Sequence, residues 1–481
     1  MIAIGCKAGL IALCLAVATA PVSSAHAGWP LAEPGAKTAR SAGTLRPAVE
    51  VEEEVYRYQP AKNGAGPLWC HGSTCLVRIG DRVFASGIET LPGVLPLNNC
   101  RWTLFERAAH GWQLKQADEK GHTREPSPLA GFPDGNLFLY ANPTLARTAE
   151  PHGGPARPEV LRFSAADAAG SPKRISPVWS GTPAFSEHSY RSFAADGPGR
   201  ELVLFQNIGY THAEWSFRDA AGKWSAQGKL TWPWGAEYDQ PQPIRVCYPN
   251  VALRNRAVYF CGVSDIVEPY QSWRQYKKQL TGREWDYDFR RLFYTWTADI
   301  TTGTFHPWIE IASRDKTCGS ISPGDLYLAP DGAVHLVWTE RAIDERLRAK
   351  FFPNALPSYE LNYAVIRDGK VIQRRSLLHS DDGSEVPASA RFQVTPENRL
   401  FVLYYVQGRN ASGQSLSEDR VLEIYPDGTP SSAVRLPLKR PFTSYFTATV
   451  RAGSPPSRII EMLGERAGLP NTISYARIKL W

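Results

Sequence analysis

The stretch Ala390-Arg-Phe-Gln-Val-Thr-Pro-Glu-Asn-Arg-Leu-Phe-Val-Leu-Tyr404 decides the fold, because it holds a complete β-hairpin in one short segment. An alternating strand over Ala390–Val394 reaches a turn at Pro396–Asn398 and continues as a more apolar strand over Arg399–Tyr404. Pro and Asn favour the backbone angles of tight turns, and the alternation is typical of a half-buried strand. The stretch therefore predicts the two inner strands of a sheet.

The same strand, turn and strand pattern recurs along the whole chain. Its turns lie at Gly80-Asp81, Pro133–Gly135, Asp196–Gly199, Arg254-Asn255, Pro330–Gly332, Pro396–Asn398 and near Ser454. They are about 62 residues apart on average, which is enough for four strands and their loops. We therefore predict an all-β protein, a seven-bladed β-propeller of four-stranded blades over residues 49–481. Two packed β-sandwiches are the alternative, but they would not explain seven matched hairpins.

The last copy of the repeat is one strand short. After the strand Thr472–Leu480 the sequence ends, whereas Val49–Tyr56 near the start alternates clearly and has no hairpin of its own. We expect this N-terminal strand to join the last blade, which closes the ring and removes two exposed sheet edges.

The first residues have the pattern of a signal peptide. Lys7 precedes an apolar run over Ala8–Ala20, and Ala25-His-Ala27 is a small-x-small cleavage pattern. The run is too short to span a membrane. We expect residues 1–27 to be a signal peptide, with a buried N-terminal helix as the alternative. Residues 28–48 then form a leader or linker, and the mature protein is secreted or periplasmic after cleavage near Ala27.

The composition limits the partners. Of the 481 residues, 15 are Trp and 20 are Tyr, which fits many short strands and also a surface that stacks on sugar rings. The net charge of +7 is spread along the chain, so no basic arm for nucleic acid is expected. Weak attraction to an acidic polysaccharide or ordinary solubility would both explain this charge. No membrane partner is expected, and we expect a monomer.

Six cysteines remain after the expected cleavage, and no two of them form a CxxC pair. Export permits disulfides. Cys247 and Cys261 lie symmetrically about Arg254 in a hairpin, so they are the candidate pair. The pairing of the others stays open.

Candidate catalytic residues gather where the third inner strand begins. Ligands of propellers usually sit on the face where the inner strands begin, and Glu187-His-Ser-Tyr-Arg191 opens the third copy, with His212 after its second strand. Removal of a uronate C5 proton needs a base, an acid and a cation, and we assign these roles to His188, Tyr190, Arg191 and His212. In the alternative, His188 and Tyr190 only satisfy loop backbone groups.

Equivalent positions in the other blades supply candidate substrate-binding residues. These are Arg124, Glu125, Asn142, Glu187, Tyr248, Asn250, Asp325, Glu340, Arg341, Arg391 and Tyr445. The arginines among them would recognise a carboxylate or sulfate, or would form ordinary ion pairs between blades. Glycoside hydrolysis would instead need two carboxylates. No metal site or cofactor is predicted, although His188 and His212 are a weak pair for a structural divalent metal such as zinc.

The longest insertion, between the fourth and fifth turns, predicts a short helix over Tyr270–Leu280. It also holds Trp285-Asp-Tyr-Asp288, a segment that could form a rim stacking on sugars.

The seven hairpins and the aromatic outer strands resemble the sialidase-like, BNR-repeat propellers, and among these the ulvan-lyase kind. The resemblance is architectural and covers residues 49 to 481. The sialidase repeat Ser-x-Asp-x-Gly-x-Thr-Trp is approximated by Ser216-Phe-Arg-Asp-Ala-Ala-Gly-Lys-Trp224, with a longer spacing and no Thr. The resemblance implies that His, Tyr and Arg near the central cavity do the chemistry, and His188, Tyr190, Arg191 and His212 are similar in type.

The sequence therefore favours a secreted carbohydrate-active enzyme, first a polysaccharide lyase acting by β-elimination on a uronate-containing polysaccharide. A sialidase-like glycoside hydrolase is the second hypothesis. A non-catalytic propeller that binds glycan or protein is the third.

Overall fold

The computed structural model describes residues 45–146, 154–409 and 412–481. The expected signal peptide and residues 28–44 of the expected leader lie outside this part of the chain. From Leu45 to Trp481 the described residues form one unit.

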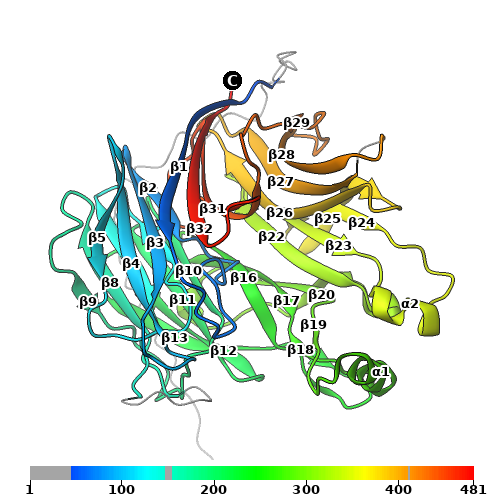
Figure 1. The fold of residues 1–481 in the computed structure, drawn as a ribbon. Coiled ribbons are helices and arrows are strands. Elements are labelled where there is room, and N and C mark those ends of the chain that lie inside the picture. The colour runs from blue at the N-terminus through cyan, green and yellow to red at the C-terminus, as the bar shows by residue number, and fades with distance from the viewer. Residues whose placement is uncertain (1–44, 147–153, 410–411) are drawn as a thin grey trace, which may run out of the picture. The chain divides into compact units, whose positions relative to one another are not determined.

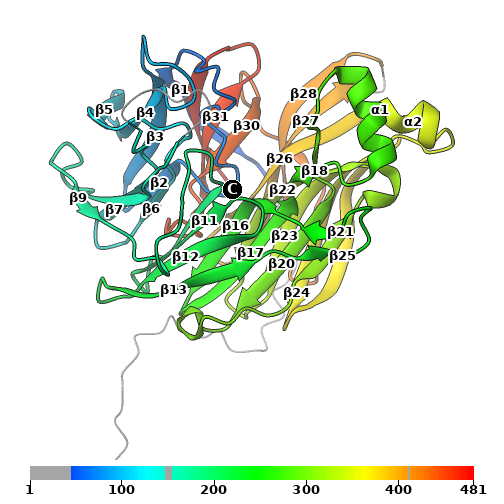
Figure 2. The same cartoon turned by 90° about the horizontal axis from the view of Figure 1, so that it is seen from below.

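Seven antiparallel four-stranded sheets build this unit, and they follow one another in chain order in Figure 2. The prediction of a seven-bladed β-propeller is confirmed. The innermost strands are β2 (Leu76–Ile79), β6 (Leu129–Gly131), β10 (Arg191–Asp196), β16 (Val246–Arg254), β22 (Ser320–Leu328), β26 (Glu385–Val394) and β30 (Phe442–Thr447). The second strands are β3 (Arg82–Thr90), β7 (Asn136–Ala141), β11 (Glu201–Ile208), β17 (Ala257–Ser264), β23 (Val334–Arg341), β27 (Leu400–Arg409) and β31 (Ile459–Arg466).

The outer half of each blade is a second hairpin or its equivalent. The third strands are β4 (Cys100–Ala108), β8 (Glu159–Ser164), β12 (His212–Arg218), β20 (Arg291–Thr297), β24 (Tyr359–Arg367), β28 (Ser415–Ile424) and β32 (Thr472–Lys479). The outermost strands are β5 (Gly111–Ala117), β9 (Lys173–Ile175), β13 (Trp224–Thr231), β21 (Ile309–Ser313), β25 (Lys370–Ser380), β29 (Val434–Arg435) and β1 (Ala48–Arg57).

The N-terminal strand closes the ring, as predicted. β1 pairs antiparallel with β32, with Glu52 opposite Ala476, and Figure 1 shows the blue β1 beside the red strands of the last blade. An ion pair of 2.6 Å between Arg107 and Glu53 ties this strand to the first blade. Both ends of the described chain are therefore held by one sheet, and the last blade has no missing strand.

The hydrophobic core lies between neighbouring blades. One cluster joins Leu361 and Tyr363 of the fifth blade to Phe392, Val402 and Tyr404 of the sixth. The inner strands are apolar on both faces because each is covered by the next blade, which accounts for runs such as Leu400–Val406 that are buried throughout.

The two ends of the propeller differ in their connections. We call the end where the innermost strands begin the loop face, and the end where the innermost hairpins turn the hairpin face. Turns on the hairpin face are tight: Gly135 (φ 89°) and Gly332 (φ 85°) adopt the left-handed backbone that glycine allows after Pro-Asp.

Longer insertions lie on the loop face, between second and third strands. The helix α1 (Gln271–Thr281) confirms the helix predicted over 270–280, and it packs on α2 (Glu345–Phe351) through Trp273 and Phe352, whose ring centroids are 5.4 Å apart (Figures 1 and 2). The remaining short elements are β14 (Trp234–Gly235), β15 (Gln242–Pro243), β18 (Ile266–Val267), β19 (Tyr287–Asp288), and the 3-10 turns η1 (Ile300–Thr302) and η2 (Asp315–Thr317). Among the described helices, neither has the length and apolar character needed to cross a bilayer.

The expected Cys247–Cys261 disulfide is wrong. The hairpin turns at Asn255-Arg256 rather than about Arg254, and a bulge follows Cys247, so Cys247 lies opposite Val263 and Cys261 lies opposite Asn250. The six cysteines of the described chain are all free and buried.

Candidate functional site

The candidate site is built from four segments of the loop face. Trp69 and His71 precede β2, Arg124 and Glu125 precede β6, and residues 187–190 precede β10. Tyr248 lies inside β16 at a bulge, where its backbone is left-handed (φ 48°). A positive φ at a tyrosine is uncommon, so the bulge turns this side chain out of the regular alternation of the strand.

Aromatic rings from these segments, together with Phe289 from between β19 and β20, form one cluster. It consists of Trp69, His71, His188, Tyr190, Tyr248 and Phe289, which we call the aromatic cluster. Ring centroids are 5.2 Å apart for His188 and Tyr190 and 4.9 Å apart for Tyr190 and Tyr248, and Trp69 lies 6.4 Å from both His188 and Tyr248. Tyr190 is buried, whereas the other members are half-buried. Five of the six rings therefore keep part of their surface accessible to a ligand.

A carboxylate orients one of the two histidines of the cluster, His188. Nδ1 of His188 lies 2.7 Å from Oε1 of Glu125, and their side chains are 30% and 5% exposed. A carboxylate on Nδ1 favours the tautomer with the proton there. Nε2 of His188 is then the ring nitrogen that can accept a proton from a ligand.

Burial shifts the pKa values around His188. It raises the pKa of Tyr190 and of Tyr248 well above the ordinary tyrosine value, because the phenolate would be poorly solvated. Burial, together with the charge of Arg391, lowers the pKa of His71 to about 4. At neutral pH the two phenols are proton donors, and the His71 ring is uncharged.

Two arginines beside the cluster, Arg124 and Arg245, have a carboxylate neighbour. Arg124 and Glu187 approach to 3.5 Å, and Glu187 also accepts a hydrogen bond of 3.1 Å from the Gly154 backbone N–H. Arg245 and Asp265 form a shorter pair of 2.5 Å. Of these two arginines, Arg124 has the looser partner and is the better able to exchange it for an anionic ligand.

Arg191 lies beneath His188 rather than beside it. Its side chain is 1% exposed, donates to the Pro126 carbonyl at 2.8 Å and lies 3.8 Å from Glu125. Two of its nitrogens, Nε and one terminal nitrogen, lack a hydrogen-bond partner among the described residues. Arg191 therefore stabilises the charge of Glu125 from below and does not reach the surface.

Deeper along the propeller axis, charged groups form an axial network. Arg451 donates to Asp325 at 2.9 Å, to Asn250 at 3.0 Å and to the Gly72 carbonyl at 3.1 Å. Arg391 donates to the His71 carbonyl at 3.1 Å. The network joins strands of the fourth to seventh blades to the segment that carries Trp69, so Asn250, Asp325 and Arg391 support the site from behind.

The remaining predicted residues lie away from the aromatic cluster. His212 begins β12 and contacts Thr211 (2.7 Å) and Glu214 (3.1 Å). Asn142 bonds Ser186 and Gln206 between blades, and Glu340 accepts from Trp338 and Arg374.

Arg341 is exposed and lies over Tyr359, whereas Tyr445 is buried. The expected rim around Trp285 is split: Trp285 is 61% exposed, but Asp288 is buried in a pair with Arg290.

Sequence reasoning missed Trp69, His71, Arg245 and Asp265. The signal was present, because Trp69 and His71 precede the first inner strand, Arg245 precedes the fourth, and Asp265 follows the second strand of that blade. The same positional rule that selected Glu125 and His188 selects all four.

No group of three His, Cys, Asp or Glu side chains that could hold a metal ion occurs within residues 45–146, 154–409 and 412–481. His188 and His212, the weak pair considered for zinc, have different partners.

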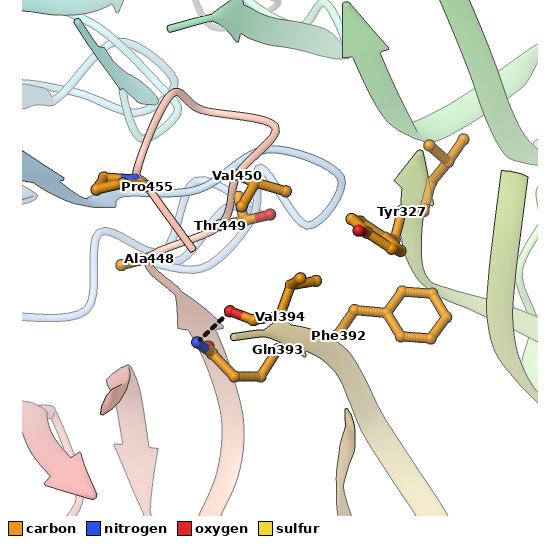
Figure 3. A pocket seen from close by; sticks show the side chains of 9 residues that line it. Tyr327, Phe392, Gln393, Val394, Ala448, Thr449, Val450 and Pro455 are labelled. Atoms are coloured by element: carbon orange, nitrogen blue, oxygen red, sulfur yellow. Dashed lines mark hydrogen bonds between the residues drawn. The ribbon is translucent and has the colours of Figure 1, made fainter. Parts of the chain in front are cut away.

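A small cavity lies near the axis toward the hairpin face. It is lined by residues of the fifth, sixth and seventh blades, among them Tyr327, Phe392 and Val450, and has a volume of about 10 Å³ (Figure 3). Gln393 points across its edge and donates to the Val394 carbonyl at 3.3 Å (Figure 3). The volume suits at most one water molecule, so the cavity is no sugar site.

Comparison with solved structures concerns the fold. The chain is similar to an ulvan lyase of polysaccharide lyase family PL25 bound to -[GlcA(1-4)Rha3S]-, with a TM-score of 0.50, 9% identity, and coverage of 91% of this chain and 95% of that one. It is also similar to polysaccharide lyase Uly1 (TM-score 0.47, 12% identity, 90% and 93% covered). A third similar structure is the Penicillium chrysogenum alpha-L-arabinanase complexed with arabinobiose (0.39, 11%, 73% and 92%).

No protein-family model matches the chain, and no curated protein matches it.

Proposed function

We propose that the protein is a polysaccharide lyase that cleaves a uronate-containing polysaccharide by β-elimination. The observation that carries this proposal is the contact of 2.7 Å between His188 and Glu125 inside a half-buried aromatic cluster. It combines a base that a carboxylate orients with rings that can hold a sugar.

The reaction requires one base and one acid on this cluster. Nε2 of His188 takes the C5 proton of the uronate, and the electron pair of that C–H bond forms the C4–C5 double bond. The bond from C4 to the bridging oxygen breaks, and this oxygen receives a proton from a tyrosine. Tyr248 is the better donor because it is half-buried, whereas Tyr190 lies behind it at 7% exposure.

A cation must neutralise the uronate carboxylate while C5 loses its proton. Arg124 suits this role, because its 3.5 Å pair with Glu187 is long and its neighbour in the chain, Glu125, contacts His188. Arg191 acts as a positioning residue, since it is buried and bears on Glu125.

Hydrolysis fits the geometry less well, because it needs two available carboxylates. The four carboxylates among the predicted site residues already have partners, namely His188 for Glu125, Arg124 for Glu187, Arg451 for Asp325 and Trp338 for Glu340. A glycan-binding propeller without turnover is the remaining alternative, and the turnover assay described below distinguishes it from an enzyme.

The protein is proposed to act outside the cytoplasm, after removal of residues 1–27. Intact-mass measurement of the exported protein would give the new N-terminus, and a mass that retains these residues would contradict this part of the proposal.

The test is turnover on a panel of uronate-containing polysaccharides. The repeat -[GlcA(1-4)Rha3S]- of the ulvan-lyase complex is the first substrate to try, since that protein shares the fold. Lyase activity produces an unsaturated uronate, read by ultraviolet absorbance, and hydrolysis produces reducing ends without it.

His188→Ala should abolish the absorbance change, and His212→Ala, a matched histidine of the same blade outside the cluster, should not. Reducing ends without absorbance would favour a hydrolase, and binding without either product would favour a binding propeller.

A further inference from the structure

A polar hollow, separate from the small cavity near the axis, lies on the hairpin face between the second and third blades. Its volume is about 150 Å³, and three arginines line it. Arg162 comes from β8, Arg200 from the β10–β11 turn, and Arg218 from the end of β12. The innermost strands run away from the loop face before these turns, so the hollow and the aromatic cluster open at opposite ends of the propeller.

The arginines of the hollow are unpaired. Within the described residues, none of their three guanidinium groups forms a hydrogen bond or an ion pair with another side chain or with the backbone. Arg218 is only 9% exposed, and its Nε has no hydrogen-bond partner in the described chain. A buried cationic nitrogen without a partner is unfavourable unless a ligand or water supplies the acceptor.

The nearest carboxylates are used to close turns. Oδ1 of Asp134 accepts hydrogen bonds from the backbone N–H (3.1 Å) and the side chain (2.8 Å) of Asn136. Oδ1 of Asp219 accepts from the backbone N–H of Lys223 at 2.9 Å. Three guanidinium groups therefore face one carboxylate, that of Asp134, in the lining of the hollow.

The turn that carries Arg218 leaves room for it. Gly222 has a left-handed backbone (φ 82°), and a Cβ there would lie 2.6 Å from a terminal nitrogen of Arg218. Phe138 supports the guanidinium group from the other side, 5.8 Å from its ring centroid. This turn is Ser216–Trp224, the sialidase-like motif, and the aromatic cluster makes no use of it.

We propose that this hollow binds an anionic group, the sulfate ester or carboxylate of an acidic polysaccharide, as a second site that takes no part in the chemistry. Arginine donors match the oxygens of both groups, and a partly buried site strengthens the contact. The three arginines indicate that the ligand carries a negative charge, whereas its assignment to a polysaccharide rests on the proposed function.

Binding to the whole mature protein tests the proposal by calorimetric titration at low salt. The probes are glucose 6-sulfate, glucuronic acid, inorganic sulfate and inorganic phosphate, with glucose as the neutral control. We expect saturable binding of at least one anionic sugar and none of glucose. A response to inorganic sulfate and phosphate but to neither anionic sugar would assign the hollow to a free anion and would overturn the glycan part of the proposal.

Variants locate the binding. Arg162→Gln combined with Arg200→Gln should weaken it at least tenfold, and both positions are exposed or half-exposed, so the fold should persist. Arg458→Gln is the matched control, because Arg458 is an exposed arginine at the same end of the propeller but is paired with Glu397 at 2.7 Å. Arg218→Met tests the buried member while keeping its packing on Phe138.

The outcome is independent of the proposed function. Arg458→Gln should leave this binding unchanged, and a loss of turnover in His188→Ala says nothing about the hollow. Equal affinity in the wild type and in the Arg162/Arg200 double variant would overturn the proposed site, whether or not the protein is a lyase.

Discussion

The arginines beside the aromatic cluster on the loop face and the arginines of the hollow on the hairpin face differ in their partners. On the loop face, Arg124, Arg191 and Arg245 each lie within 3.8 Å of a carboxylate. On the hairpin face, Arg162, Arg200 and Arg218 line one hollow, and no carboxylate of the described chain pairs with them. Internal pairs fix the position of neighbouring groups, whereas unpaired cations are available to a ligand. In the two proposals above, the loop face carries the chemistry and the hollow on the hairpin face binds an anionic group.

The largest expected effect is on the positioning of His188. Glu125→Gln should lower kcat by about 10²–10⁴-fold with little change in KM, because an amide no longer holds the imidazole with its proton on Nδ1. Steady-state kinetics on a uronate polymer measures the split. Glu187→Gln is the matched control, since Glu187 contacts Arg124 and should affect KM more than kcat. Equal kcat values in Glu125→Gln and the wild type would break the account of the loop face.

Removing one charge from the axial network should strongly lower the free energy of unfolding. Asp325→Ala leaves Arg451 buried without its carboxylate, and the expected loss is about 3–5 kcal/mol in the free energy of unfolding. Denaturant titration measures it. Asp331→Ala removes a carboxylate from an exposed pair with Arg367, and we expect about 1 kcal/mol or less. Similar losses of unfolding free energy in Asp325→Ala and Asp331→Ala would show that the axial network does not support the candidate site.

The stability should also depend on pH through His71. The pKa of His71 is lowered from 6.5 to about 4 by burial and by Arg391, so the folded protein binds fewer protons than the unfolded chain in this interval. The free energy of unfolding should therefore fall as the pH decreases from 6.5 to about 4.

His71→Gln should reduce this slope, with a remainder from His335, whose pKa burial also lowers to about 4. His110→Gln, at an exposed turn, is the control. An unchanged slope in His71→Gln would contradict the lowered pKa of that ring.

The smallest effect belongs to the hairpin face. Burial and the neighbouring charge of Arg162 lower the pKa of Arg218. Arg162→Gln should therefore raise the free energy of unfolding at low salt, by about 0.5 kcal/mol or less. Sulfate should stabilise the wild type more than this variant, since a ligand that binds only the folded state adds to its stability. Thermal unfolding with and without sulfate compares the two, and equal responses would contradict an anion site there.

The fold was predictable because each blade repeats its own local signals. Pro-Asp-Gly at 133–135 and 330–332 forces a tight turn, and the alternation of Val49–Tyr56 identifies a strand without a hairpin partner. The Cys247–Cys261 pair failed because strand register depends on the residue at which the turn occurs and on bulges. The bulge after Cys247 gives no signal in the spacing of the cysteines.

The candidate site was predictable only by position. Choosing residues near the start of each inner strand selected Glu125, His188 and Tyr248, which lie close together in the structure. The same choice selected Asn250 and Asp325, which lie deeper along the propeller axis. The depth of a residue along the propeller axis depends on the stagger of the strands and on bulges. The pattern of residue types along the sequence does not show either of these. The hairpin-face hollow escaped because its arginines are 38 and 18 residues apart in the sequence. Only the packing of two blades reveals that they share one volume.

Initial rates on a uronate polymer and on a short oligosaccharide of the same repeat test the division between the two faces most directly. The rates would be followed by ultraviolet absorbance of the unsaturated product in the wild type, His188→Ala and the Arg162→Gln/Arg200→Gln double variant. We predict no activity in His188→Ala on either substrate, and in the double variant an unchanged rate on the oligosaccharide with a higher KM for the polymer. Turnover by His188→Ala at the wild-type rate, or loss of oligosaccharide turnover in the double variant, would contradict the account.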